Sequence, residues 1–96
     1  MRDGYPSRSQ QAAWRVYDGQ AVILCPDDST LNTLNVIGTL IWQAADGQTP
    51  LSVMVAKICA EFDVEPARAE QDTRSFIDAL SRRGLLTVSE SPPDVP

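Results

Sequence analysis

The hydrophobic pattern of this 96-residue chain changes from strand-like to helical at Asn35, and this change limits the fold more than any other feature. Before Asn35, β-branched and aromatic residues from Ala13 to Tyr17 and from Gln20 to Cys25 flank an Asp-Gly pair. That arrangement predicts a β-hairpin with a two-residue turn. Pro26 to Ser29 predicts a second turn, and Thr30 to Leu34 predicts a short third strand.

After Asn35, apolar residues recur every three to four positions, which predicts three helices. Asn35 is an N-cap residue type, and the first helix is expected to close at Gly47. The second begins with Thr49 as N-cap and Pro50 at its first position, and the third runs from Pro66 to Gly84. The expected fold class is therefore α+β and winged-helix-like, with a three-stranded antiparallel sheet followed by three helices.

The two ends of the chain lack an apolar period. Residues 1–12 are polar and predict a flexible N-terminal tail, while residues 89–96 read S-E-S-P-P-D-V-P and predict a disordered C-terminal tail. One folded domain is expected over residues 13–88, with Leu85 to Val88 returning as a brief extended segment.

The composition argues against catalysis. The chain has no His, so it lacks the usual general base near neutral pH and the commonest nitrogen ligand for transition metals. Cys25 and Cys59 are interpreted as small buried hydrophobes rather than a disulfide or a nucleophile. We therefore expect no catalytic residue, no metal and no cofactor. Trp42 is expected in the core, whereas Trp14 fits either the core or a recognition surface.

The charge balance argues against nucleic acid and anionic membranes as partners. Lys and Arg total 8 against 13 Asp and Glu, which gives a net charge of −5. The apolar run from Val36 to Trp42 falls far short of the roughly 20 residues that span a bilayer, and no signal peptide is recognisable. A cytoplasmic location is expected.

Several short motifs occur in an order and spacing typical of one family. Leu34-Asn35 is followed by a small residue at Gly38 and by Ile41-Trp42, and Asp46 to Thr49 reads D-G-Q-T. Asp72, Phe76-Ile77, Leu80 and Gly84-Leu85-Leu86 match a closing D-x-x-x-F-I-x-x-L-x-x-x-G-L-L pattern. The chain from Ala13 to Val88 thus resembles the PqqD-like family, whose members are recognition elements of ribosomally made, post-translationally modified peptides (RiPPs).

The resemblance implies a peptide chaperone that binds the leader of a precursor peptide by β-strand addition. The leader would pair with the third strand, Thr30 to Leu34, and its side chains would enter a cleft toward the third helix. It implies presentation to a separate modifying enzyme, such as a radical S-adenosylmethionine protein, in pyrroloquinoline quinone or other natural product biosynthesis. Cys25-Pro26-Asp27 departs from the Tyr-Pro-Glu expected in the pyrroloquinoline quinone subgroup, so the pathway stays open. Either a monomer or a strand-exchanged dimer is compatible with an open strand edge.

The candidate peptide-binding residues come from the third strand and the third helix. They are Thr30, Leu31, Asn32, Thr33, Leu34, Arg74, Ile77, Asp78, Ser81 and Arg82. Leu31 and Ile77 are candidates for apolar contacts, with Ile77 a core residue in the alternative. Arg74 and Arg82 are spaced to pair with acidic leader residues, or Asp78 instead holds Arg74 in an exposed helix pair.

The principal rival function is a winged-helix DNA-binding transcriptional regulator, which would place the third helix in the major groove. Between Pro66 and Gly84 four Arg stand against three acidic residues, a balance of only +1, which attracts phosphates weakly. An enzyme is the third reading, and the missing His and the small size argue against it.

Overall fold

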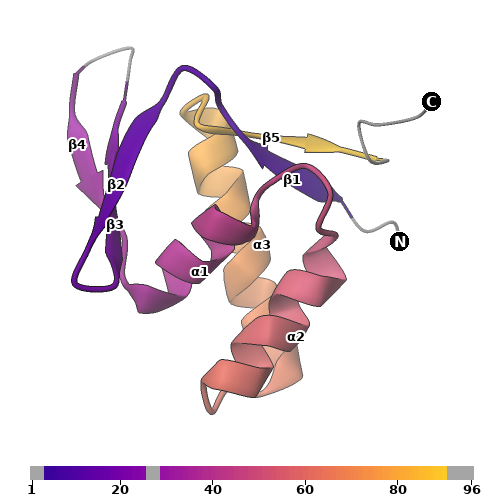
Figure 1. Ribbon diagram of the computed structural model, residues 1–96. Coiled ribbons are helices and arrows are strands. Elements are labelled where there is room, and N and C mark those ends of the chain that lie inside the picture. The colour runs from indigo at the N-terminus through magenta and orange to yellow at the C-terminus, as the bar shows by residue number, and fades with distance from the viewer. Residues whose placement is uncertain (1–3, 26–28, 91–96) are drawn as a thin grey trace.

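The computed structural model describes residues 4–25 and 29–90. Figure 1 shows a three-stranded sheet at one end of the molecule, a two-stranded ribbon at the other, and three helices packed beside them. In chain order the elements are β1 (Tyr5–Arg8), β2 (Ala13–Tyr17), β3 (Gln20–Leu24), β4 (Leu31–Thr33), α1 (Val36–Ala44), α2 (Leu51–Glu61), α3 (Pro66–Arg82) and β5 (Leu86–Ser89).

The larger sheet has the order β2-β3-β4 and is antiparallel throughout. Tyr17 pairs with Gln20, and the two residues between them have positive φ, 52° at Asp18 and 78° at Gly19. Two successive positive φ values define the type I′ turn that matches the twist of a hairpin, and Gly adopts this region without strain. The predicted hairpin, third strand and three helices are confirmed, and with them the α+β fold class.

The helix ends follow local side-chain chemistry. Asn35 Oδ1 accepts the Gly38 N–H at 2.7 Å, which caps α1 as predicted. Pro66 occupies the first turn of α3, and Gly84, with φ of 75°, ends it. The N–H groups of Gly84 and Leu85 donate to the Ser81 and Leu80 carbonyls, so α3 closes in a Schellman motif.

Two predicted helix ends are wrong by one or more residues. The N-cap of α2 is Pro50, not Thr49, because the extended conformation that precedes the helix continues through Pro50. Helix α1 stops at Ala44 with Ala45 as its C-cap, before Gly47. Gly47 instead takes a φ of 80° within the connection to α2.

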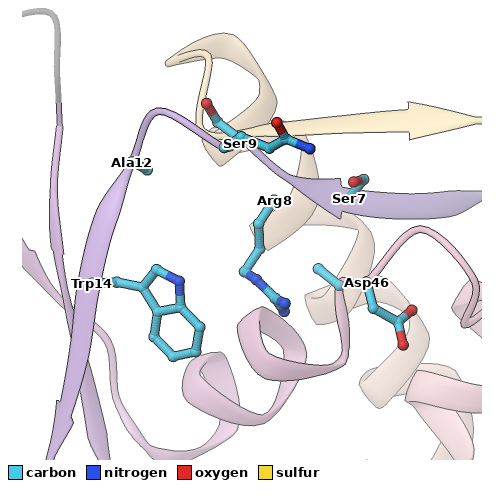
Figure 2. A pocket seen from close by; sticks show the side chains of 8 residues that line it. Ser7, Arg8, Ser9, Ala12, Trp14 and Asp46 are labelled. Carbon is cyan, nitrogen blue, oxygen red and sulfur yellow. The ribbon is translucent and has the colours of Figure 1, made fainter.

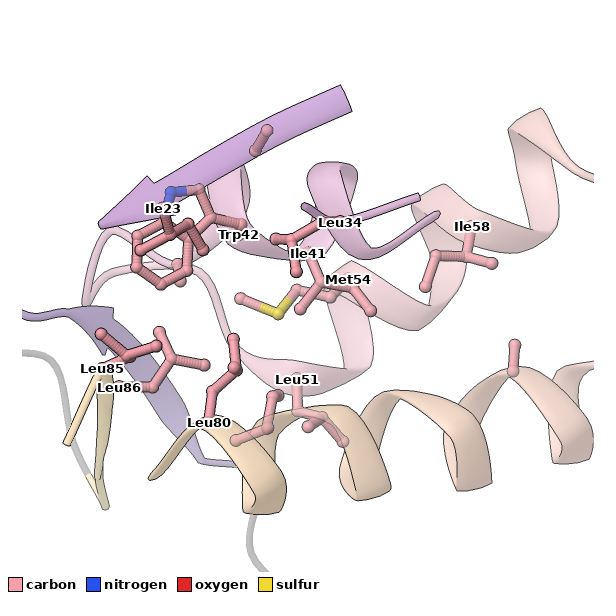
Figure 3. Close-up of a cluster of buried hydrophobic side chains, with 14 of the residues drawn as sticks. Ile23, Leu34, Ile41, Trp42, Leu51, Met54, Ile58, Leu80, Leu85 and Leu86 are labelled. Atoms are coloured by element: carbon pink, nitrogen blue, oxygen red, sulfur yellow. The ribbon is translucent and has the colours of Figure 1, made fainter. Parts of the chain in front are cut away.

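The core lies where the helices meet β3 and β5. Trp42, Ile23 and Met54 are fully buried, and Figure 3 shows their side chains converging with those of α2, α3 and the chain entering β5. Trp42 is therefore a core residue, as predicted. Cys25 is buried, Cys59 is half-buried against the core, and both are free thiols, which confirms the structural interpretation of Cys25.

The sequence-based assignment of residues 1–12 to a flexible tail is wrong for β1. Tyr5–Arg8 pairs antiparallel with β5, from Tyr5 opposite Ser89 to Arg8 opposite Leu86. On its other side, β1 bonds the α1–α2 connection, where Arg8 N–H donates to Ala45 O and Gly47 N–H to Pro6 O. The segment is thus held between two remote parts of the chain.

Pro6 is compatible with this strand because of where its missing N–H would point. In an antiparallel ladder successive residues direct their backbone groups to alternate sides. Arg8 N–H donates to Ala45 O, whereas the next residue, Ser9, donates its N–H to Leu85 O, on the side of β5. The even-numbered residues of β1 therefore direct their backbone N–H and C=O groups toward the α1–α2 connection. Pro6 therefore costs β5 no hydrogen bond, and its buried ring adds packing.

The remaining chain ends and turns are only partly described. Leu86–Ser89 confirms the predicted extended segment, and Ser89 belongs to a strand rather than to a tail. The predicted turn at residues 26–28 and most of the predicted C-terminal tail, residues 91–96, lie outside the described residues. Among the described helices, none has the length and apolar character needed to cross a bilayer.

Candidate functional site

Strand β4 leaves one edge of the larger sheet open. Cys25 N–H donates to Thr30 O, and Leu34 N–H donates to Ala21 O, so the even-numbered residues of this segment bond β3. Leu31 and Thr33 therefore direct their backbone N–H and C=O groups away from the sheet. Within the part of the chain that the structure describes, no strand pairs with these groups, so Leu31 and Thr33 offer what a further strand would need.

The side chains of β4 alternate between the two faces of the sheet. Leu31 lies opposite Leu24 and is 69% exposed, on the outer face together with Val22. Asn32 lies opposite the fully buried Ile23, which places it on the face covered by the helices. Leu31 therefore does not point toward the third helix, as the cleft prediction requires, and is available instead to a ligand on the outer face.

One flank of α3 meets β4 through Arg83 and the start of α1 through Phe76. Arg83, directly after the helix, donates from Nη1 to Asn32 Oδ1 at 2.6 Å and from Nη2 to Thr30 Oγ1 at 3.3 Å. The Phe76 ring lies over the start of α1, where a Cβ on Gly38 would be 3.0 Å from its Cε1. Phe76 and Arg83 are seven residues apart and share one stripe of the helix. We call the open edge of β4 with Phe76 and Arg83 the β4 edge site.

The same stripe of α3 continues past Phe76 toward its N-terminus. Arg68 and Asp72, at i and i+4, pair with each other at 3.2 Å and line a hollow of about 430 Å³. Ile37 lines the same hollow from α1. A peptide that leaves the β4 edge site along α3 would meet this hollow next.

Arg74 and Ser81, both predicted contacts, lie on the opposite flank of α3. Arg74 lines a small hollow with Leu51 and Val55 of α2 and pairs with Glu70 at 3.0 Å. Ser81, seven residues after Arg74, shares its flank. The structure therefore does not bring these two residues to β4.

The alternative in which Asp78 pairs with Arg74 is wrong in its choice of partner. Asp78 pairs with Arg82 at 3.0 Å, and both side chains are well exposed to solvent. Arg74 and Arg82 each form an ion pair with the acidic residue four positions before them. That partner is Glu70 for Arg74 and Asp78 for Arg82. Arg82 and Asp78 thus face solvent, away from the edge of β4.

Ile77 and Leu34 belong to the core. Ile77 is 5% exposed and Leu34 is 8% exposed, and both join the cluster around Trp42. For Ile77 the core alternative is therefore the observed placement. A peptide at the β4 edge would contact neither side chain without displacing core packing.

A second hollow, of about 380 Å³, lies between β1 and β2 and is drawn in Figure 2. Arg8 projects into it between Trp14 and Asp46 (Figure 2). Arg8 Nη1 donates to the carbonyls of Trp42 and Gln43 at 2.8 and 2.9 Å, and its guanidinium stacks 5.2 Å from the Trp14 ring centroid. Trp14 also makes an edge-to-face contact with Trp42, so these aromatic groups serve packing of β2 on α1.

Phe76 and Arg83 are the site residues that the sequence did not reveal. The spacing of Ala69, Thr73, Ile77 and Leu80 identifies the buried stripe of α3, and Phe76 and Arg83 then fall on one flank of it. The sequence contains no signal for which flank faces β4, because that depends on how α3 packs on α1.

The described residues contain no group of three or more His, Cys, Asp or Glu side chains placed to hold a metal ion. The pKa of the Asp46 carboxyl group is lowered below its ordinary value, chiefly by the Gln48 N–H. The N–H bonds of Gln48 and Thr49 give Asp46 a role in the turn between α1 and α2.

Two solved structures share this fold. "TbiB1 in Complex with the TbiA(beta) Leader Peptide" superimposes with a TM-score of 0.76 at 29% identity, over 83% of this chain and 93% of the other. "Lasso peptide synthetase B1 complexed with the leader peptide" gives 0.74 at 21% identity, over 86% and 98% of the two chains. At that lower identity the second likeness shows the fold alone.

Sequence comparison identifies the family. A curated relative, the "PqqA binding protein" of Rhizobium meliloti (strain 1021), is 31% identical over 70 residues, which cover 73% of this chain and 69% of the relative. The family model described as coenzyme PQQ synthesis protein D matches residues 20–86, from the start of β3 into β5. The chain therefore belongs to the PqqD family.

Proposed function

We propose that this protein binds the leader segment of a ribosomally made precursor peptide as an additional antiparallel strand beside β4. The observation that carries the proposal is the open edge at Leu31 and Thr33 of β4, the strand that Arg83 bonds through Asn32, with Phe76 of α3 over the adjoining start of α1. The relative named for binding PqqA and the leader-peptide complex of TbiB1 support this choice of ligand.

The geometry suits recognition of an extended peptide from both sides. Backbone bonds to Leu31 and Thr33 would give affinity for any extended chain, and alternate side chains would give specificity. Peptide residues on the outer face would meet Leu31, which is 69% exposed and continues the apolar stripe of Leu24. Those on the inner face would meet Asn32 and the flank of α3.

In this proposal the protein is a peptide chaperone and not a catalyst, and it works without a cofactor. It would present the bound leader to a separate modifying enzyme, such as a radical S-adenosylmethionine protein, in pyrroloquinoline quinone or other RiPP biosynthesis. Family membership supports this role. Strand addition leaves the rest of the precursor free, as a presenting protein requires.

The DNA-binding alternative has less support. Arg68, Arg74 and Arg82 each pair with a carboxylate on α3, so the helix offers phosphates little net positive charge. Recognition of the major groove would also need base-reading side chains along an exposed helix face. The charged side chains of α3 are all engaged in these ion pairs.

The test removes a backbone N–H of β4 that points to the open edge. Thr33→Pro removes an N–H that points to the open edge while keeping the ladder with β3, so the domain should stay folded. Affinity for synthetic leader peptides of precursors encoded beside the gene should fall about tenfold, the equivalent of one lost hydrogen bond and local steric conflict. Calorimetric titration gives the affinity, and circular dichroism verifies the fold.

Two variants provide matched controls. Thr33→Val alters the same side chain but keeps the N–H, so binding should persist. Val16→Pro removes an outward donor from β2, the opposite edge of the same sheet, and should leave binding unchanged. Titrations belong at concentrations where the protein is monomeric, since the β4 edge also allows pairing with a second copy. A folded Thr33→Pro variant of undiminished affinity would rule out addition at β4.

A further inference from the structure

Arg83 links the end of α3 to β4 through one guanidinium group. Nη1 donates to the side-chain oxygen of Asn32 at 2.6 Å, and Nη2 donates to Thr30 Oγ1 at 3.3 Å. These partners are more than 50 positions away in sequence, so the contact is a tertiary one at the β4 edge site. Arg83 itself remains exposed to solvent.

The partners of Arg83 are neutral, which distinguishes it from the other Arg of this region. Arg68, Arg74 and Arg82 each lie within 3.2 Å of a carboxylate four residues away on α3. Within residues 4–25 and 29–90, the Arg83 guanidinium makes hydrogen bonds only to an amide and a hydroxyl oxygen. Its positive charge has no acidic partner there, although a guanidinium carries five donors suited to a carboxylate.

Asn32 adds a second unsatisfied donor at the same place. Its Nδ2 is buried and has no hydrogen-bond partner among the described residues, while its Oδ1 accepts from Arg83. A buried amide N–H without an acceptor costs free energy, so this donor would gain from a ligand oxygen. The Nδ2 group and the guanidinium are held close together because Asn32 Oδ1 and Arg83 are bonded to each other.

We propose that Arg83 and Asn32 recognise an acidic side chain, Asp or Glu, at an inward-facing position of the peptide that adds to β4. This inference rests on the proposed function and specifies its ligand. A carboxylate has two oxygens, so it accepts from the Arg83 guanidinium and from Asn32 Nδ2 at the same time. It also neutralises a charge that has no acidic partner within residues 4–25 and 29–90. Asn32 and Arg83 are therefore specificity-determining residues of the β4 edge site.

The test begins from displayed random peptides, since the leader itself is not identified. Libraries are selected against the wild-type protein, Arg83→Gln and the matched control Arg82→Gln. Arg82 is the neighbouring, exposed Arg that pairs with Asp78, and its replacement removes the same charge. Wild type and Arg82→Gln should enrich Asp or Glu at one fixed position between apolar residues. Arg83→Gln should keep the apolar preference and lose the acidic one.

The selected wild-type peptide is then synthesised with an amidated C-terminus, so that any carboxylate recognised belongs to a side chain. Exchanging its acidic residue for the amide should weaken binding to the wild type about 10- to 100-fold, as expected for a charge-assisted pair. The same exchange should cost Arg83→Gln almost nothing. The exchange in the peptide needs no protein variant, so the test survives even if Arg83→Gln is unstable.

The outcomes separate the inference from the function on which it rests. Two results would overturn the role of Arg83 and leave strand addition in place. In the first, the selected peptides show no preference for an acidic residue. In the second, exchange of the acidic peptide residue for its amide lowers the affinity of wild type and of Arg83→Gln equally. If the selected peptide bound only when its C-terminus was a free carboxylate, and not when it was amidated, recognition of a side chain would also be overturned. A folded wild-type protein that selects no peptide at all would overturn both proposals.

Discussion

Asp46 shows how a single residue organises the connection between α1 and α2. Its Oδ1 accepts the N–H of Gln48 at 2.8 Å and of Thr49 at 2.9 Å. Gly47, between Asp46 and Gln48, has a φ of 80°, a value that other residues adopt only with strain. The D-G-Q-T motif noticed in the sequence is therefore a turn motif, and it places Gly47 N–H to bond Pro6 O of β1.

The lowered pKa of Asp46 predicts a small pH-dependent term in stability. A carboxyl group whose pKa is lower in the folded state stabilises the fold above its unfolded pKa, about 3.9, and this contribution is lost as pH falls through the folded pKa. Asp46→Asn keeps an acceptor oxygen but has no charge. Wild type should exceed Asp46→Asn in unfolding free energy at pH 7, by less than about 1 kcal/mol because the group is exposed.

Urea unfolding of both proteins at pH 7 and at pH 2.5 measures this term. The difference should shrink at the lower pH, because protonation of Asp46 removes the charge that strengthens the turn. A difference that stays constant over this range would mean that charge on Asp46 is not what strengthens the turn.

At the residue scale, the sequence predicted best what depends on nearest neighbours. Asn35 as a cap and Gly84 as a stop follow from chemistry within four residues, and both are confirmed. The positions of Arg74 and Arg83 depend on which flank of α3 faces β4, which no local pattern encodes. Leader binding at β4 therefore stays a prediction, whereas Arg74 of the predicted helix side lies on the flank of α3 away from β4.

At the scale of elements, Thr39 joins the sheet to α1 at the point where β4 ends. Leu34 N–H donates to Ala21 O, but Ala21 N–H does not complete the pair with Leu34 O. It donates instead to Thr39 Oγ1 at 2.8 Å, and that hydroxyl donates to Leu34 O at 3.4 Å. The Thr39 hydroxyl thus stands between the two backbone groups and satisfies a buried N–H as the chain turns into the helix.

Replacing Thr39 with Val should therefore destabilise the domain by about 1–3 kcal/mol, because Ala21 N–H would be left buried without an acceptor. Val retains the shape of Thr, so loss of packing would not explain the effect. Urea unfolding measures the cost, and hydrogen exchange at Ala21 should accelerate in parallel. Thr87→Val, at an exposed position of β5, is the control and should change stability by less than about 0.5 kcal/mol.

Thr39→Ser provides the contrary test, since Ser keeps the hydroxyl and loses the methyl group. It should be more stable than Thr39→Val. If the Ser variant were the less stable of the two, methyl packing rather than the hydrogen bond would be the contribution of Thr39.

At the scale of the whole molecule, the chain closes on itself through β1 and β5. This pairing was missed because β1 is four residues long, contains Pro6 and has no alternating apolar pattern. Its stability comes from partners in β5 and in the α1–α2 connection, far along the chain. The sequence predicted the sheet of β2, β3 and β4 because a local turn specifies that hairpin, whereas only the tertiary fold specifies β1 beside β5.

Arg8 connects this closing ribbon to the rest of the fold. Its guanidinium caps the carbonyls of Trp42 and Gln43 in the last turn of α1, where a positive charge also complements the helix dipole. It lies 5.2 Å from the Trp14 ring of β2 as well. One side chain therefore joins β1, α1 and β2, so the two sheets are coupled through it.

Arg8→Met keeps the apolar stem and removes the donors and the charge, so it should lower the unfolding free energy by about 1–3 kcal/mol. Arg15→Met, on the outer face of the larger sheet, is the control and should have little effect, because Arg15 is exposed and lines an open surface hollow. Hydrogen exchange should show faster opening of β1 and β5 than of β3 in the Arg8 variant. Peptide binding at the β4 edge should persist, since β4 lies at the opposite edge of the sheet from β2, the strand that Arg8 contacts. Loss of binding in a folded Arg8→Met protein would show instead that the closing ribbon and the β4 edge site behave as one cooperative unit.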